Sequence, residues 1–78
     1  MTLTLYGRDY CELCEAMYAA VLPLAAQHGC TVEWVDVADD PALEARFGTE
    51  IPVLLAGERV LCRHALDLEA LTRYFGPG

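Results

Sequence analysis

The chain has 78 residues, enough for one domain, and 55% of them are hydrophobic, which supplies the core that so short a chain needs. Its 12 acidic residues against 5 basic ones give a formal net charge of -7, which disfavours nucleic acid and membrane surfaces as partners. No apolar run approaches the roughly 20 residues of a transmembrane helix, and the N-terminus lacks a basic, apolar leader, so we expect a cytoplasmic protein.

The first part of the chain predicts a strand followed by a helix. β-Branched and apolar residues alternate over residues 2–6, and Gly7 ends this run, as in a short strand. Apolar residues then recur at helical spacing over residues 13–24, where we expect Pro23 to kink or end the helix and Gly29 to stop whatever continues. The predicted buried face comprises Leu13, Ala16, Met17, Ala20, Val21 and Leu24.

The middle of the chain predicts a second strand and a short helix. Residues 31–35 are rich in β-branched and aromatic side chains, which favour a strand. Asp40 and Pro41 are typical of an N-cap and a first helical position, and Gly48 closes a segment in which Phe47 lies one turn from Leu43.

The last part of the chain predicts a hairpin and a terminal helix. Residues 52–55 and 60–62 read as two antiparallel strands, joined by a tight turn at Gly57-Glu58. Asp67 is a suitable cap for a helix that ends at residues 76–78. Leu68, Leu71 and Phe75 share one face of this helix.

The predicted order is β-α-β-α-β-β-α, an α/β fold. The first two strands would form a parallel unit through the first helix, and the hairpin would extend the same sheet to four strands of mixed direction. Helices on both faces explain why no strand has a consistently polar side: the first and third helices would cover one face and the second helix the other.

Two cysteines at the start of the first helix form the candidate redox site. A helix N-terminus offers free backbone donors and the positive end of the helix dipole, and both stabilise the thiolate that attacks disulfides, so Cys11 is the predicted nucleophile. Cys14 lies about one turn further on, close enough to act as the resolving thiol. Arg8 adds positive charge nearby, whereas Glu12 and Glu15 oppose thiolate formation.

The second candidate element is Ile51-Pro52, at the start of the third strand. We expect this loop to lie opposite the helix terminus that carries the cysteines. A cis bond there would expose the backbone of Ile51, so that an extended substrate could pair with it like an added strand. The dipeptide alone favours an ordinary trans proline, because only about 5–6% of X-Pro bonds are cis.

The Cys-x-x-Cys after the first strand, Arg8 three residues before it, and Thr49-Glu50-Ile51-Pro52-Val53-Leu54 before the hairpin together resemble the glutaredoxin family. The likeness is to short bacterial glutaredoxin-like proteins and spans essentially the whole chain, residues 1–78, as a single domain. The resemblance implies a thioredoxin fold, a cis Pro52 and dithiol chemistry. It also implies that Arg8 meets one end of glutathione.

Two departures from the family pattern bear on glutathione. Glu12-Leu13 stands where glutaredoxins usually have Pro-Tyr or similar residues, which should change the redox potential and the thiol acidity. The Gly-Gly-x-Asp-like loop that binds the glutathione carboxylate is replaced by residues 62–67, of which only Asp67 and its helix N-terminus remain for that role. We expect no bound cofactor, with glutathione as a possible co-substrate.

The remaining cysteines and Tyr10 have simpler interpretations. Tyr10, next to Cys11, would shield the thiol or line a substrate groove. Cys30 and Cys62 are predicted to be buried small hydrophobes. A zinc site built from Cys11, Cys14, Cys30 and a histidine is disfavoured, because the distant ligands lack the short spacing of structural zinc sites.

The sequence therefore predicts a monomeric thiol-disulfide oxidoreductase. It would reduce protein disulfides or glutathione mixed disulfides through Cys11 and Cys14, with Arg8, Tyr10 and Asp67 among the substrate-binding residues. Ile51 and Pro52 would shape the docking groove. The alternatives are a catalytically weak binding module with the same fold and, less favoured, a metal-holding domain.

Overall fold

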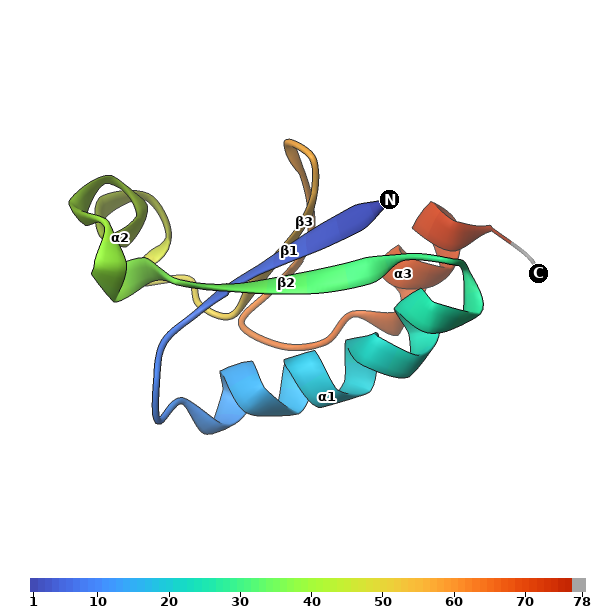
Figure 1. Cartoon of the computed structure of the whole chain (residues 1–78), viewed down its shortest axis with the longest axis horizontal. Coiled ribbons are helices and arrows are strands. Elements are labelled where there is room, and N and C mark those ends of the chain that lie inside the picture. The colour runs from blue at the N-terminus through green and yellow to red at the C-terminus, as the bar shows by residue number, and fades with distance from the viewer. Residues whose placement is uncertain (77–78) are drawn as a thin grey trace.

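A computed structural model describes residues 1–76, so the predicted chain end at Pro77 and Gly78 lies outside the described residues. The seven predicted helices and strands all occur, in the predicted order, and a short 3₁₀ helix that the sequence did not predict follows the second strand (Figure 1). The elements are β1 (Thr2–Gly7), α1 (Glu12–Gln27), β2 (Thr31–Asp36), η1 (Val37–Asp39), α2 (Pro41–Phe47), β3 (Val53–Ala56), β4 (Arg59–Arg63) and α3 (Leu68–Phe75).

The four strands form one mixed sheet in the order β2-β1-β3-β4. β1 pairs with β2 in parallel and with β3 in antiparallel orientation, and β3 and β4 form the predicted hairpin with Gly57 at a φ of 61° in its turn. The register shifts between Leu54, which pairs with Cys62, and Leu55, which pairs with Val60. This bulge lets Leu61 and Cys62 both be buried, although they are consecutive in β4.

The core is divided into two clusters by the sheet. One cluster joins β1 to α1 and α3, through residues such as Leu5, Met17 and Leu71. The other joins β3 to α2 and η1, through Val53, Phe47 and Val37. The predicted arrangement is confirmed: α1 and α3 share one face and α2 lies on the other, with α1 running alongside β1 and β2 (Figure 1). No helix within residues 1–76 is long and apolar enough to cross a bilayer.

The helix α1 differs from its prediction in which face it buries. Cys14, Met17, Val21 and Ala25 form its buried stripe, while Ala16 is exposed and Leu13 is 61% exposed. Successive residues in a helix are about 100° apart, so Leu13 lies a quarter turn or more away from Cys14, which faces the sheet. The buried face of α1 is therefore rotated about the helix axis relative to the predicted face, because the prediction did not include the small residues Cys14 and Ala25 among the buried residues.

The predicted early end of α1 at Pro23 is wrong. The helix continues to Gln27, and Pro23 lies on its exposed side, where the missing backbone donor leaves the packing intact. Gly29 ends the helix as predicted: it has a φ of 69°, its N–H donates to the Ala26 carbonyl, and the N–H of Cys30 donates to the Ala25 carbonyl. This pair of bonds is a Schellman motif, which requires a residue that tolerates positive φ.

Candidate active site

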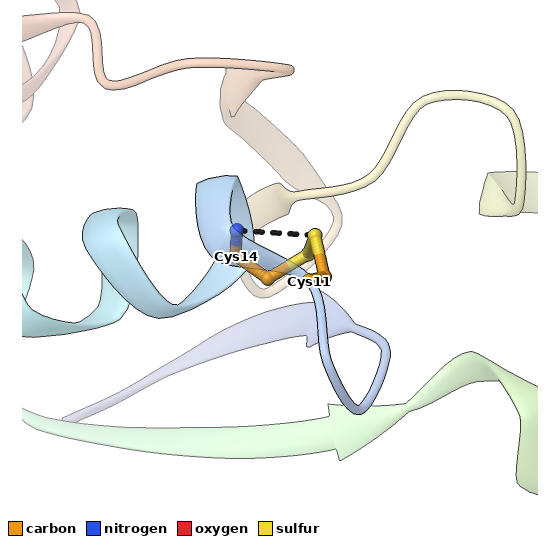
Figure 2. The surroundings of a disulfide bond; sticks show 2 residues. All are labelled: Cys11 and Cys14. Atoms are coloured by element: carbon orange, nitrogen blue, oxygen red, sulfur yellow. Dashed lines mark hydrogen bonds between the residues drawn. A yellow bond between two sulfur atoms is a disulfide. The ribbon is translucent and has the colours of Figure 1, made fainter.

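Cys11 and Cys14 form a disulfide across the first turn of α1, with their Cα atoms 5.2 Å apart (Figure 2). Cys11 is the N-cap residue, and its Sγ accepts a hydrogen bond of 3.2 Å from the backbone N–H of Cys14. A donor held in this position also stabilises negative charge on the Cys11 sulfur once the disulfide is reduced. The structure thus brings the two predicted sulfur atoms together at a helix N-terminus.

The two cysteines differ in their access to solvent. Cys14 is completely buried, whereas Cys11 is partly exposed. Cys14 packs against the end of β1, where a Cβ on Gly7 would lie 3.1 Å from the Cβ of Cys14 and 3.0 Å from the Trp34 ring. A larger residue at this position would require Cys14 or Trp34 to shift by a few tenths of an ångström. An incoming disulfide can therefore reach Cys11 but not Cys14.

Two apolar side chains flank Cys11 on the outside of the molecule. Tyr10 is fully exposed, and its backbone has a φ of 60°, a left-handed conformation that is uncommon for residues other than glycine. Leu13, between the two cysteines, also points to solvent. The exposure of Tyr10 argues against its shielding the sulfur and leaves it available to a binding partner.

Arg8 is engaged by a residue that the sequence did not identify. Its two terminal nitrogens donate to the two carboxylate oxygens of Glu44 in α2, over 2.9 and 2.7 Å. This hydrogen-bonded pair raises the pKa of Arg8 and lowers the pKa of Glu44. Glu44 was missed because the pairing depends on how α2 lies beside the end of β1, for which residue spacing gives no signal.

The peptide bond between Ile51 and Pro52 is cis, as the family resemblance implied. Val53 pairs with Tyr6, so the same antiparallel register places Pro52 opposite Gly7, the residue against which Cys14 packs. The side chain of Pro52 is fully buried. The topology therefore brings the Ile51-Pro52 loop to the end of the sheet that carries the disulfide.

Asp67 caps the helix α3. Its Oδ1 accepts the N–H of Ala70 at 3.0 Å, while its own N–H donates to the Cys62 Sγ at 3.4 Å. No hydrogen bond or ion pair within residues 1–76 links Asp67 to Cys11 or Cys14. The structure thus places Asp67 at a helix start of its own, as predicted, but does not join it to the disulfide.

Cys30 and Cys62 are free thiols buried in the core cluster beneath α1, as predicted. Burial raises the pKa of the Cys62 thiol, because a thiolate there would lose its hydration. No group of three or more histidine, cysteine or acidic side chains gathers around a common point in the described part of the chain.

Comparison with known proteins agrees with this geometry. Residues 2–76 match the family model described as Glutaredoxin-like domain (DUF836). The chain is similar to protein Ne2328 from Nitrosomonas europaea, with 29% identity and a TM-score of 0.83 over 94% of this chain and 88% of that one. It is also similar to a structural genomics target protein from X. campestris, with 33% identity and a TM-score of 0.66 over 92% of each chain.

A third similar structure identifies the fold. Thioredoxin 1 from Thermosipho africanus superposes with a TM-score of 0.64 at 23% identity, over 95% of this chain and 93% of that one. Together with the mixed four-stranded sheet and its helices on both faces, this similarity shows a thioredoxin fold. No relative was found among curated protein sequences.

Proposed function

Because the chain belongs to the family of glutaredoxin-like domains, we propose that it is a dithiol oxidoreductase that reduces protein disulfides or glutathione mixed disulfides. The observation that carries this proposal is the Cys11–Cys14 pair on the first turn of α1, of which Cys14 is completely buried and Cys11 is partly exposed. A structural disulfide would have no need of one exposed sulfur at a helix N-terminus.

The reaction proceeds by two exchanges of sulfur partners. The Cys11 thiolate attacks one sulfur of the substrate disulfide, forms a mixed disulfide with it and releases the other substrate sulfur as a thiolate, which takes up a proton. Cys14 then loses its proton and attacks the Cys11 sulfur, which releases the second substrate thiol and leaves the Cys11–Cys14 disulfide. Two electrons pass from the protein to the substrate, and an external thiol reductant returns them.

The surroundings of Cys11 supply the substrate contacts in this proposal. Tyr10 lies on the exposed side of Cys11, and the register of β1 and β3 supports a groove formed with Ile51 and Pro52. We assign Arg8 and the N-terminus of α3 at Asp67 to the polar groups of the substrate, by analogy with glutathione binding in glutaredoxins. The guanidinium of Arg8 already donates to Glu44, and the carboxylate of Asp67 already accepts the N–H of Ala70. Substrate can therefore bind to these two groups only if their present hydrogen bonds rearrange.

The buried free thiols suit a reducing compartment. Cys30 and Cys62 both belong to the core and are not joined to each other or to the Cys11–Cys14 pair. Unpaired core cysteines are typical of proteins from compartments in which thiols stay reduced. We propose that the protein acts there, in the cytoplasm, as a monomer.

The decisive experiment is turnover of a mixed-disulfide substrate with glutathione and its recycling enzyme, for the wild type, two active-site variants and one control variant. Cys11→Ser should abolish turnover. Reduced Cys14→Ser, mixed with the substrate in the absence of glutathione, should accumulate a mixed disulfide on Cys11, seen by mass spectrometry as the added mass of one substrate thiol. Cys30→Ala removes a core thiol remote from the reaction and serves as the control. Unchanged turnover in both active-site variants would rule out the enzymatic function.

A second function, a binding module with little turnover, is favoured by one observation. Tyr10 and Leu13 are large apolar side chains held in solvent beside the disulfide, as in a contact surface for another protein. The same turnover experiment separates the two functions, since a binding module would show no rate above the uncatalysed exchange. The midpoint potential of the Cys11–Cys14 couple against glutathione then gives the direction of electron flow.

A further inference from the structure

We propose that the dithiol prefers disulfides borne on neutral or cationic polypeptide segments over anionic ones such as glutathione disulfide, and that Glu44 sets this preference by occupying Arg8. This inference rests on the proposed oxidoreductase function and specifies its substrate class. Glu44 is then a specificity residue of the active site, although it lies on α2 and far from the cysteines in sequence.

The first step concerns the one cation that precedes the cysteines. A carboxylate on a substrate would be bound by the terminal nitrogens of Arg8, but both of these already donate to Glu44. The pair is accessible, because the side chains of Arg8 and Glu44 are 37% and 43% exposed. An anionic substrate must therefore compete with Glu44 for the guanidinium, and the paired guanidinium offers little net positive charge to attract it.

The second step concerns the charges that remain around Cys11. Asp9, Glu12 and Glu15 are exposed, and none of the three has an ion-pair partner within residues 1–76. They lie in the loop before Cys11 and in the first turn of α1. The approach to the Cys11 sulfur is thus negatively charged, which slows the encounter with anions and speeds the encounter with cations.

The third step concerns the other four arginines, the only lysine or arginine side chains besides Arg8 in the sequence. Arg63 pairs with Glu50, and Arg73 pairs with Glu69. The two that remain stack on aromatic rings: Arg46 on Phe47 and Arg59 on Tyr74. The rings of Phe47 and Tyr74 are uncharged, so Arg46 and Arg59 keep their positive charge, but they lie at the end of α2 and the start of β4 and not in the loop or helix turn that carries Cys11.

The fourth step explains why the favoured substrate is a polypeptide. Tyr10 and Leu13 offer apolar contact area beside Cys11 that does not depend on the charge of the substrate. A polypeptide segment can fill this area with its side chains while its basic residues meet Asp9 and Glu12. A small anionic thiol compound has neither contact. The electron transfer is the same in both cases, and only the encounter and binding differ.

The test measures the second-order rate at which the reduced protein is oxidised by three small disulfides. Oxidised glutathione is anionic, 2-hydroxyethyl disulfide is neutral and cystamine is cationic. Acid quenching, alkylation and mass spectrometry follow the loss of the Cys11–Cys14 dithiol, and each rate is divided by the rate of dithiothreitol with the same disulfide. This division removes the intrinsic reactivity of the probe, so the normalised order should be cystamine, then 2-hydroxyethyl disulfide, then oxidised glutathione.

The variant Glu44→Gln frees Arg8 and should raise the ratio of the anionic to the neutral rate by about fivefold, the effect of one unpaired arginine near a charged ligand. The ratio is taken within one variant, so a change in the reactivity of Cys11 cancels. Glu58→Gln removes an exposed charge from the turn between β3 and β4, at the end of the sheet opposite Gly7 and the disulfide, and should leave the ratio within about twofold of wild type.

Added salt supplies a readout that needs no variant. Raising the ionic strength from about 0.01 to 0.5 M should speed the reaction with oxidised glutathione and slow the reaction with cystamine, as screening removes the charge effect. Equal normalised rates for the three probes, an unchanged ratio in Glu44→Gln, or a salt effect of the opposite sign would each overturn the inference. Absence of catalytic turnover with the predicted rate order intact would instead overturn only the proposed function.

Discussion

At the scale of single residues, the Cys11 sulfur has two roles that reinforce each other. Helix N-caps are usually oxygen atoms of serine, threonine, aspartate or asparagine, which accept a backbone N–H of the first turn. Here the acceptor is the Cys11 sulfur, which receives the N–H of Cys14. A thiolate accepts this bond more strongly than a thiol does. Reduction and ionisation of Cys11 therefore strengthen the cap of α1 at the moment that they create the nucleophile.

The Arg8–Glu44 pair predicts a specific dependence of stability on pH. Since the pKa of Glu44 is lowered from its ordinary value of 4.5 by its bond to Arg8, the stabilisation is complete above about pH 4.5 and is lost as the pH falls through the lowered value. Wild type should therefore have a higher melting temperature than Glu44→Gln at pH 7, and this difference should shrink on acidification below pH 4.5. Thermal unfolding followed by circular dichroism measures both.

The variant Arg8→Gln removes the same ion pair by replacing its cation. The difference in melting temperature between wild type and Arg8→Gln should therefore also shrink as the pH falls below 4.5. If the difference in melting temperature between wild type and Glu44→Gln stays constant from pH 7 to pH 3, the ion pair does not contribute measurably to the stability of the folded state. Because both side chains of the pair are more than a third exposed, high salt should also reduce the difference in melting temperature at pH 7.

At the scale of elements, α1 contains a proline that the helix tolerates without ending. Pro23 cannot donate to the carbonyl four residues before it, and its ring crowds the same turn. Its side chain is exposed, so an alanine there would lose no packing. We expect Pro23→Ala to stabilise the protein by about 2 kcal/mol in urea unfolding, less than the full helix penalty, because alanine also loosens the unfolded chain. Leu22→Ala, next to it on the helix, is the control and should change stability little.

The cap of α3 predicts separable effects on stability and on activity. Asp67→Ala removes the bond to the Ala70 N–H and should cost about 1 kcal/mol in urea unfolding. Asp67→Asn keeps an oxygen acceptor and should restore most of that stability. If the charge of Asp67 also contacts substrate, Asp67→Asn will change the KM for glutathione mixed disulfides while stability stays near wild type. An equal KM in wild type and Asp67→Asn would leave Asp67 with a structural role alone.

The elements were predictable where local chemistry determines them. Asp40 and Asp67 accept backbone N–H groups at the two helix starts, and Gly29 and Gly57 adopt positive φ values at a helix end and a turn. The sequence-based prediction was wrong or incomplete where the local structure depends on contacts with other segments of the chain. The face of α1 is set by the sheet beneath it, so Leu13 followed the helical pattern and yet is exposed. The 3₁₀ helix at residues 37–39 was not foreseen, although the Asp36 side chain caps it.

At the scale of the whole molecule, the candidate site depends on contacts between distant segments. The motif predicted Cys11 and Cys14, since both lie on a single turn. The position of the Ile51-Pro52 loop at the disulfide end of the sheet depends instead on the pairing of β1 with β3, and the partner of Arg8 comes from α2, 36 residues away. The predicted architecture already suggested a role for the proline loop, but only the family resemblance favoured the cis bond at Pro52, and no pattern in the sequence pointed to Glu44. Motifs thus locate the reactive atoms, while the tertiary fold determines what surrounds them.

The same distinction predicts opposite outcomes for two chemically identical substitutions. Leu5 lies in β1, between β2 and β3, and is completely buried, so Leu5→Ala leaves a cavity that should cost about 2–5 kcal/mol. A domain of this size has a free energy of unfolding of roughly 4–12 kcal/mol, so Leu5→Ala should remove a large part of it. Leu13→Ala removes the same atoms from an exposed position and should change stability by less than about 0.5 kcal/mol.

Urea unfolding followed by the fluorescence of Trp34, the single tryptophan, measures both variants with the Cys11–Cys14 pair held in one redox state. Trp34 packs edge-on against Tyr18 and beside Gly7, so its emission reports on the layer between α1 and the sheet. Helical periodicity alone assigns Leu13 to the core and would predict comparable losses for the two variants. Comparable losses would therefore contradict the orientation of α1, and with it the assignment of Cys11 as the accessible sulfur.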